Sequence, residues 1–353
     1  MTNMMTTAVQ YAIDDIRIEE RPVPEIGPGE LLLKTLACGL CGGETMAWYK
    51  TEPKVLGHEP VGEVVEVGAG VTDYKIGDRV FVNHHVGRVD SHLSRRGHFT
   101  RDPFYKSMKL DPGGVCDYYR VTAQHLAMDT HKLPDSISTE AAVTIEPWSC
   151  VLSGLKVCNI QPGDTVAVVG AGFMGQGFVH MAPLFGAGKV VALDFSDWRL
   201  AKAREFGATH TINPKTEDAV EAMRALNNGR LADTVIVIAP FSPAWDQALA
   251  LTEVGGCLHL GAPMPPGETW ARDGNAAYFD QITVTSRYSS DHTDTYSYIR
   301  LLEAGRIKAE EAISHRFDMA DTPEAFRMLV EAEKSLKIVV YPHGVPAAKQ
   351  EAA

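Results

Sequence analysis

Apolar residues gather in short runs over the first 150 residues of the chain. The runs at 31–37, 62–68 and 78–83 are rich in Leu, Val and Phe, and Gly, Pro or Asp bounds them. Short runs of this kind between turn residues are typical of strands, because β-branched and aromatic side chains pack well on a pleated surface. The pattern predicts an all-β, barrel-like unit rather than helices for this part of the chain.

From residue 163 the pattern changes to fully apolar runs that alternate with segments of helical length. Strands buried on both faces lose the alternation of half-exposed strands, and repeated strand–helix units build parallel sheets. We therefore predict a doubly wound parallel sheet, followed by a tail of mixed structure. The expected strands lie at 189–194, 233–239, 257–262 and 281–288, and the expected helices at 173–187, 196–208 and 243–256.

Composition and charge exclude two classes of protein. The 353 residues are enough for two domains, and the formal net charge is −12 without a basic cluster. Such a chain is a poor nucleic-acid binder, because that affinity comes mainly from neutralised phosphates. No apolar run approaches the length of a membrane span, and no secretory signal is evident at the start. The six cysteines are sparse, so free or metal-bound thiols and a cytoplasmic location are expected.

A glycine-rich segment lies between a predicted strand and a predicted helix. Residues 170–175 read GAGFMG, in which Gly170 permits a tight turn, Gly172 lets the backbone approach a pyrophosphate and Gly175 permits close packing. With Phe173 and Met174 they form the start of a helix, whose free amides can bind phosphates. Alone, this motif is as easily a structural turn.

Asp194 at the end of the next strand strengthens the nucleotide interpretation. A carboxylate at this place can accept hydrogen bonds from both ribose hydroxyls and would repel a 2′-phosphate. The arrangement therefore predicts binding of NAD rather than NADP. The alternative is that Asp194 is merely a solvated strand end.

A second group of residues combines a thiol, an imidazole and carboxylates: Cys41, His58, Glu59 and Glu146. This donor set suits zinc, and a catalytic zinc needs one exchangeable position. Zinc lowers the pKa of an alcohol bound to it, which favours hydride loss to a nicotinamide. Taken singly, Cys41 could form a redox pair with Cys38 or be a buried small residue, His58 a structural histidine and Glu146 a helix-start acid.

Together these motifs resemble the zinc-containing medium-chain dehydrogenase/reductase (alcohol dehydrogenase) family, in its sorbitol/threonine dehydrogenase-like branch. The resemblance implies a GroES-like catalytic domain at 1–152 and 291–353 and a Rossmann NAD-binding domain at 153–290. It also implies a homodimer or homotetramer, with edge strands near 257–262 and 281–288 pairing between subunits. The segments that carry it are CGLCGGE (38–44), LGHEPVGEVVEVGAGV (56–71), GDRV (77–80), PGGVCDYYRV (112–121), IEPWSC (145–150), PGDTVAVVGAGFMG (162–175) and SLKIVV (335–340).

The resemblance assigns roles to individual residues. It makes Cys41, rather than Cys38, a ligand of one catalytic zinc together with His58 and Glu59, and Glu146 approaches that zinc directly or through water. Asp194 holds the adenosine ribose. The further residues placed beside the cofactor are Arg199 at the ribose and Leu260, Gly261, Ser286 and Arg287 at the nicotinamide.

The chain departs from the family at a lobe that carries four zinc-binding cysteines in many relatives. The matching positions are Arg88, Ser91, Ser94 and Asp102, none of which supplies a thiolate. A structural zinc is therefore not expected. Ion pairs among Asp102, Arg88 and the neighbouring Arg95 and Arg96 are one way to hold the loop.

Two further departures concern catalysis. The hydroxyl that commonly relays the substrate proton is missing, because Gly43 stands at its position, so another group must replace it. The candidates are Thr45 and His85. A neutral imidazole is a suitable proton acceptor, although His85 is equally well a packed strand residue. Glu44 stands where Asp is usual and can still support the metal ligands, in one arrangement together with Lys337.

The function that explains both groups of residues is hydride transfer between a small secondary alcohol or polyol and NAD. A zinc-free medium-chain reductase acting on activated double bonds or carbonyls is the alternative enzyme, against which the retained ligand set argues. A non-catalytic NAD-binding protein is the alternative of another class, because it would tolerate the missing relay and the altered lobe.

Overall fold

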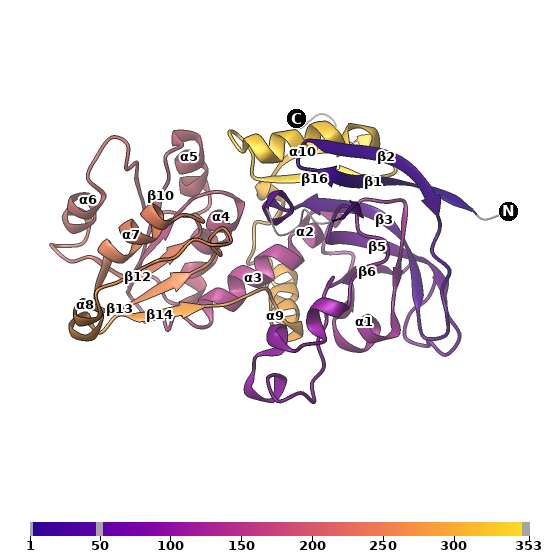
Figure 1. Ribbon diagram of the computed structural model, residues 1–353, viewed down its shortest axis with the longest axis horizontal. Coiled ribbons are helices and arrows are strands. Elements are labelled where there is room, and N and C mark those ends of the chain that lie inside the picture. The colour runs from indigo at the N-terminus through magenta and orange to yellow at the C-terminus, as the bar shows by residue number, and fades with distance from the viewer. Residues whose placement is uncertain (1–2, 47–51, 348–353) are drawn as a thin grey trace. The chain divides into compact units, whose positions relative to one another are not determined.

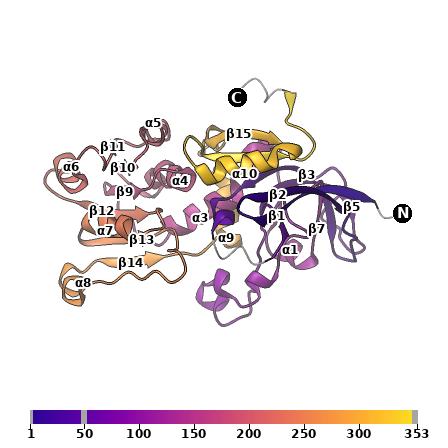
Figure 2. The same ribbon diagram turned by 45° about the horizontal axis from the view of Figure 1, so that its top comes forward.

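The computed structural model describes residues 3–46 and 52–347, which belong to two compact units. One unit comprises residues 1–149 and 290–353, and the other comprises 150–289. Figures 1 and 2 together label most of the elements of both units. Within the described residues, no helix combines the length and the apolar character that a membrane crossing requires.

The first unit is rich in β-structure. Its strands form one sheet in the order β2-β1-β4 and a second in the order β15-β16-β3-β5-β6-β8, with β7 paired to β3. The strands are β1 (Met4–Ala12), β2 (Asp15–Pro22), β3 (Leu31–Leu40), β4 (Lys54–Val55), β5 (Glu59–Val67), β6 (Arg79–Val82), β7 (Tyr118–Val121), β8 (Thr130–Lys132), β15 (Ile313–Asp318) and β16 (Lys337–Tyr341). Its helices are α1 (Ala123–Met128), α2 (Thr139–Val143), α9 (His292–Glu303) and α10 (Thr322–Glu331).

Both ends of the chain contribute to the core of this unit. Helix α10 lies beside β2, although the two are far apart in the sequence (Figures 1 and 2). Ala8, Leu40, Phe326 and Val340 share one cluster of buried side chains. Strand β16 pairs antiparallel with β3, which brings the first residue of β16, Lys337, close to Leu40. This pairing positions the C-terminal strand at the candidate metal site.

The second unit is a six-stranded parallel sheet in the order β11-β10-β9-β12-β13-β14. This order is that of a doubly wound nucleotide-binding sheet, and all five residues of the central strand β9 are buried, as expected for a strand covered on both faces. The strands are β9 (Thr165–Val169), β10 (Lys189–Leu193), β11 (His210–Ile212), β12 (Ala232–Val237), β13 (Thr252–Leu260) and β14 (Thr283–Ser286). The helices are α4 (Phe173–Met181), α5 (Asp197–Glu205), α6 (Ala219–Leu226), α7 (Ser242–Ala250) and α8 (Gly274–Asp280).

The predicted fold class, a β-rich unit and a doubly wound parallel sheet, is confirmed, but two details of the prediction are wrong. Short helices interrupt the first 150 residues, because the Ser138 side chain accepts a hydrogen bond from Ala141 N and caps α2, after which α3 (Ile145–Leu155) begins. The helix expected over 243–256 ends at Ala250. Thr252 already pairs with Ala232 of the neighbouring strand, so the TEVGG segment belongs to β13.

Candidate active site

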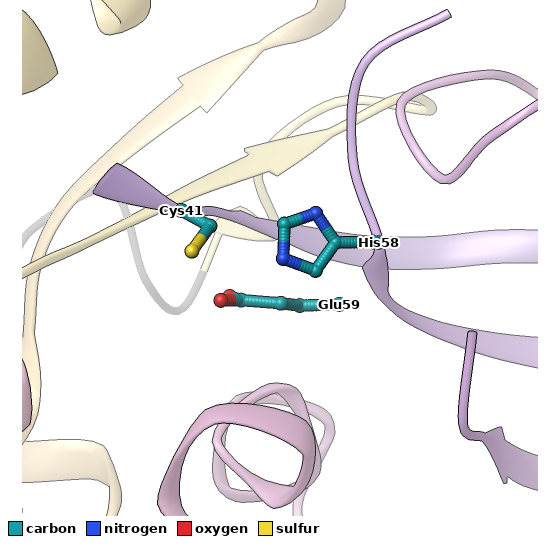
Figure 3. Close-up of side chains that lie close together, drawn as sticks. All are labelled: Cys41, His58 and Glu59. Carbon is teal, nitrogen blue, oxygen red and sulfur yellow. The ribbon is translucent and has the colours of Figure 1, made fainter. Parts of the chain in front are cut away.

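Three side chains of the first unit converge on one point, as Figure 3 shows. The Cys41 sulfur, an imidazole nitrogen of His58 and a carboxylate oxygen of Glu59 all lie within 4.8 Å of one another. Glycines make this approach possible. Gly57, which precedes His58, has a φ of +89°, and a Cβ at Gly39 would lie 2.1 Å from the Glu59 Oε2 atom.

Glu44 orients His58 and the turn before it. The Glu44 carboxylate is buried, accepts a hydrogen bond from Gly57 N at 2.8 Å and lies 3.5 Å from His58 Nδ1. Burial disfavours the charged carboxylate, but the hydrogen bond and charge of His58 outweigh burial and lower the pKa of Glu44. With Nδ1 directed at Glu44, the other ring nitrogen faces Cys41 and Glu59 (Figure 3). A carboxylate behind a metal-binding histidine fixes its ring in this way.

Lys337 balances the charge of Glu59. Its ammonium donates to both Glu59 oxygens, at 2.9 and 2.6 Å, and to Leu40 O at 3.0 Å. The ammonium is buried, which disfavours its charge, but the Glu59 charge outweighs this effect and raises the pKa of Lys337. The residue paired with Lys337 is thus Glu59, whereas the sequence suggested Glu44.

Glu146 lies on the first turn of α3, close to His84. His84 Nδ1 is 3.5 Å from a Glu146 carboxylate oxygen, and the His84 ring centroid is 4.7 Å from that of His58. Burial raises the pKa of Glu146 to about 7. Sequence reasoning missed this neighbour of Glu146. The signal was the histidine pair 84–85, which begins two residues after the end of β6.

His85 and Thr45, the two candidates for the proton relay, differ in what their polar atoms contact. His85 Nδ1 lies 2.5 Å from Met108 O, which fixes this nitrogen as a donor and leaves the lone pair on Nε2. Burial lowers the pKa of His85 to about 4, so the ring is neutral. The His85 ring centroid is 4.1 Å from that of His84. The Thr45 hydroxyl instead donates to Gly42 O at 2.8 Å.

The donor set of Cys41, His58 and Glu59 fits zinc. One thiolate, one imidazole and one carboxylate are ligands that zinc accepts in a tetrahedral arrangement, and three protein ligands leave a fourth position for water or substrate. Among the residues that the structure describes, this is the one group of three or more such side chains close enough to share an ion.

The glycine-rich loop of the second unit connects β9 to α4. Gly170 has a φ of +99°, and a Cβ at Gly175 would lie 1.9 Å from Gly170 O, so both positions require glycine. A Cβ at Gly172 would meet only the Arg199 side chain, at 3.9 Å, so space beside Gly172 is left for a ligand. No side chain caps the start of α4. A helix start without a side-chain cap and an open backbone at Gly172 fit a pyrophosphate.

Asp194 ties this loop to the end of β10. Its carboxylate accepts hydrogen bonds from Ala171 N and Ser196 N, both at 2.8 Å, and Arg199 lies 3.8 Å away. A cavity of about 460 Å³ is lined by Gly170, Gly172, Asp194 and Arg199 among other residues. The loop and the acid thus border one cavity that can accept a nucleotide.

The remaining predicted cofactor residues lie, like the glycine-rich loop, at the carboxyl ends of the parallel strands. Leu260 pairs with Ser286 at the ends of β13 and β14, and Gly261 N donates to Val237 O at 2.9 Å. Gly261 and Arg287 directly follow these two strand ends. Among the described residues, none of these four lines the cavity at Gly170.

The altered lobe holds its shape without the expected ion pairs. Arg88 lies 3.9 Å from Asp90, in an exposed contact, whereas Asp102 is buried and caps a backbone N–H two residues later. The Ser91 and Ser94 hydroxyls share a hydrogen bond of 3.0 Å. An ion pair between Arg88 and Asp102 was therefore the wrong expectation; short polar side chains satisfy the local backbone instead.

A thiol, an imidazole and a carboxylate that lie close together in one unit and a glycine-rich loop in the other are features of a metal-dependent dehydrogenase. Comparison with known proteins agrees. Residues 27–135 match the alcohol dehydrogenase GroES-like domain, and residues 174–304 match the zinc-binding dehydrogenase family.

Relatives match the chain over nearly its full length. The sorbitol dehydrogenase of Gallus gallus is 32% identical over 94% of this chain and 95% of its own. The L-threonine 3-dehydrogenase of Pyrococcus abyssi is 31% identical over 96% of this chain and 98% of its own. A zinc-binding dehydrogenase of Sinorhizobium meliloti, solved with NADP bound, is 25% identical with a TM-score of 0.84, over 96% of this chain and 100% of its own. The chain belongs to the zinc-binding medium-chain dehydrogenase family and is an NAD(P)-dependent dehydrogenase.

Proposed function

We propose that this dehydrogenase transfers a hydride between a small secondary alcohol or polyol and NAD. The observation that carries the proposal is the convergence of Cys41, His58 and Glu59 within 4.8 Å. These three residues would hold one catalytic zinc, with Glu146 approaching it directly or through water. Bound zinc would supply a Lewis acid that lowers the pKa of the substrate hydroxyl. Sorbitol is a polyol and L-threonine a hydroxy amino acid, so the names of both relatives support a hydroxyl substrate.

The other residues near the cluster keep it charged and oriented. Glu44 holds the His58 ring through Nδ1, and Lys337 neutralises the charge of Glu59. The cluster is therefore prepared for a cation before any substrate arrives, which is how enzymes lower the cost of reorganisation.

NAD is the cofactor that Asp194 favours. Its carboxylate borders the nucleotide cavity and would accept the two ribose hydroxyls, whereas a 2′-phosphate would place a second negative charge beside it. Arg199, 3.8 Å from Asp194, tempers this preference, because a guanidinium can accommodate a phosphate. We assign Gly170, Gly172, Phe173, Met174 and Gly175 to the pyrophosphate by position, and Leu260, Gly261, Ser286 and Arg287 to the nicotinamide.

His85 is the proton acceptor that we prefer in place of the missing hydroxyl at Gly43. Its Nδ1 is held by Met108 O, so Nε2 is free to accept a proton, whereas the Thr45 hydroxyl already donates to Gly42 O. Thr45 remains the second candidate, because a hydroxyl can pass on one proton while it accepts another.

We also propose that the enzyme is a homodimer or homotetramer that pairs through the edge of its parallel sheet. Strand β14 ends this sheet, and its exposed edge would be a liability in a monomer. Tyr278, Phe279, Val284 and Tyr288 are exposed near this edge.

We propose residues 1–152 with 291–353 and residues 153–290 as the limits of the two domains.

A substrate panel tests the function. Purified zinc-loaded enzyme is mixed with NAD or NADP and with polyols, hydroxy amino acids and simple secondary alcohols, and reduced cofactor is followed by absorbance. The proposal expects turnover of at least one secondary alcohol, with kcat/KM at least tenfold higher for NAD than for NADP. Turnover of carbonyls or activated double bonds by zinc-free enzyme would support the zinc-free reductase alternative. The absence of turnover in either direction would support a non-catalytic NAD-binding protein.

A further inference from the structure

Two cysteines of the second unit lie against each other, away from the glycine-rich loop. Cys158 follows α3 and its thiol donates to Gly154 O at 3.2 Å, whereas Cys257 lies on β13. The two thiols are close enough for each to shift the pKa of the other. Both line a cavity of about 330 Å³, together with Asp164, Asp233 and Glu253. Asp164 directly precedes β9, whereas the glycine-rich loop directly follows it. This cavity therefore lies at the amino ends of the parallel strands, and the glycine-rich loop lies at their carboxyl ends. The function proposed above gives these two residues no role.

Two polar side chains, Thr285 and His259, connect this cysteine pair to the interior of the sheet by hydrogen bonds. Thr285 Oγ1 lies 3.6 Å from Cys257 Sγ and 3.1 Å from His259 Nδ1. Cys257 and His259 are two residues apart on one strand, so they point to the same face, and Thr285 is opposite His259 in the register of β13 and β14. A hydroxyl in this position accepts a hydrogen bond from one neighbour while it donates to the other. Thr285 can therefore donate to a Cys257 thiolate.

The environment of Cys257 differs from that of the buried cysteines in the first unit. The neighbouring Cys158 thiol lowers the pKa of Cys257 to about 7, although burial opposes this effect. Burial raises the pKa of Cys38 and of Cys116. Because the thiolate is the reactive form of cysteine, Cys257 is the most nucleophilic of these three at neutral pH.

We propose that Cys158 and Cys257 form an oxidisable dithiol, in which a small peroxide converts the two thiols into a disulfide. The cavity beside them admits the peroxide to a pair that is otherwise buried. The adjacent thiols make the oxidation reversible, because a sulfenic acid with a thiol neighbour condenses to a disulfide before it oxidises further.

The reaction has two steps. The Cys257 sulfur attacks one oxygen of hydrogen peroxide, an S–O bond forms as the O–O bond breaks, and the thiol proton leaves with the hydroxide as water. The Cys158 sulfur then attacks the Cys257 sulfur, an S–S bond forms as the S–O bond breaks, and a second water leaves. Each sulfur gives up one electron, and the peroxide is reduced to two waters.

Formation of the disulfide between Cys158 and Cys257 changes the packing of this face of the sheet. An S–S bond of about 2.05 Å requires the two side chains to rotate toward each other. Cys257 then no longer contacts Thr285 as a hydrogen-bonding thiol, and the segment after α3 becomes covalently tied to β13.

Peptide mapping of the oxidised protein tests the proposal. Reduced, zinc-loaded, full-length protein is treated with increasing hydrogen peroxide, quenched with N-ethylmaleimide and digested with trypsin without reduction. Cys158 and Cys257 are the single cysteines of the tryptic peptides 157–189 and 231–272, so their disulfide gives one defined linked pair. The expected result is that this pair appears at peroxide concentrations that leave Cys116, in peptide 110–120, as the maleimide adduct.

Two variants make the result specific. Cys158→Ser must abolish the linked pair and leave a Cys257 sulfenic acid that dimedone traps. Cys150→Ser, in the same unit, must leave the linked pair intact. Recovery of Cys158 and Cys257 as maleimide adducts from wild-type protein in which Cys116 is already oxidised would overturn the proposal, as would a linked pair that forms no earlier than other disulfides.

Discussion

The metal cluster and the nucleotide loop are built in opposite ways. The loop is one continuous segment, residues 170–175, in which Gly172 leaves space beside the backbone and Gly175 packs closely against Gly170 O. The cluster is made of side chains from distant segments; Lys337 and Glu59, for example, are 278 positions apart. The loop therefore depends on the absence of side chains, and the cluster on the presence of particular ones.

This difference determines where each site is vulnerable. Five ionisable side chains around the cluster are buried or nearly so, and each needs a partner of opposite charge or a metal to offset its desolvation: Glu44, His58, Glu59, Glu146 and Lys337. The loop contains no charged residue, so its limits are steric. Substitutions should accordingly change stability through charge in the first site and through contact in the second.

The largest effect is expected for Lys337→Met. It leaves the Glu59 carboxylate buried without its ammonium partner, which costs about 3–5 kcal/mol of unfolding free energy. Urea unfolding of metal-free protein measures this loss, and zinc should reduce it by supplying positive charge. The control is Lys308→Met, whose exposed contact with Glu311 spans 3.7 Å and should matter by less than about 0.5 kcal/mol. Equal losses in both variants would contradict the charge-based account.

His85→Asn tests the proposed relay. If His85 Nε2 accepts the substrate proton, kcat/KM should fall by about 100-fold, in the range for general base catalysis. Because the pKa of His85 is lowered to about 4, the acceptor is present above that pH and is lost as the pH falls through it. The variant should therefore lack this acidic limb in the profile of kcat/KM against pH. His92→Asn, at an exposed position of the lobe, is the control, and a profile unchanged in His85→Asn would transfer the role to Thr45.

Gly175→Ala and Gly172→Ala separate the two steric demands of the loop. The added Cβ of Gly175→Ala would lie 1.9 Å from Gly170 O, so both Tm and NADH affinity should fall, the latter by roughly 30-fold. Gly172→Ala meets no close protein atom, so only NADH affinity should fall. Gly274→Ala, with open space around it, should change neither. Calorimetry of binding and thermal unfolding give both readouts, and unchanged NADH affinity in Gly172→Ala would contradict the pyrophosphate assignment.

Glu44→Gln should have the smallest effect, about a tenfold loss of zinc affinity. The amide retains an oxygen that can accept from Gly57 N, but the charge opposite His58 is removed. Losses of 10- to 100-fold are usual when a residue behind a metal ligand is replaced. Competition with a chelator of known affinity measures the change, and Glu63→Gln on β5 is the control. An affinity equal to wild type would remove Glu44 from the site.

Local patterns in the sequence were sufficient for the fold class and for the turn at the glycine-rich loop. Fully apolar runs between helical segments predicted the parallel sheet, and the glycine spacing predicted a turn whose conformation now explains each glycine. The predicted end of α7 was wrong because residues 251–254 have no stop signal, and the first glycines after the helix are Gly255 and Gly256. Thr252 joins a strand only through pairing with Ala232, which is not encoded locally.

The contacts around the cluster could not be read from the sequence. The pairing of Lys337 with Glu59 depends on the register of β16 against β3, and the approach of His84 to Glu146 depends on where α3 begins relative to β6. From the residue types alone, Lys337 was predicted to pair with Glu44 rather than with Glu59. In the lobe, the charges at Arg88 and Asp102 suggested an ion pair that the folded chain does not form.

The most direct test of the central claim is the zinc content and turnover of Cys41→Ala beside wild type. The account predicts one zinc per chain in wild type, loss of that zinc in the variant, and a fall in turnover of at least about 1,000-fold, equivalent to about 4 kcal/mol of transition-state stabilisation. NADH affinity should change by less than about twofold, because the nucleotide loop does not involve Cys41. If Cys41→Ala retains both its zinc and its turnover, the cluster is not the catalytic metal site.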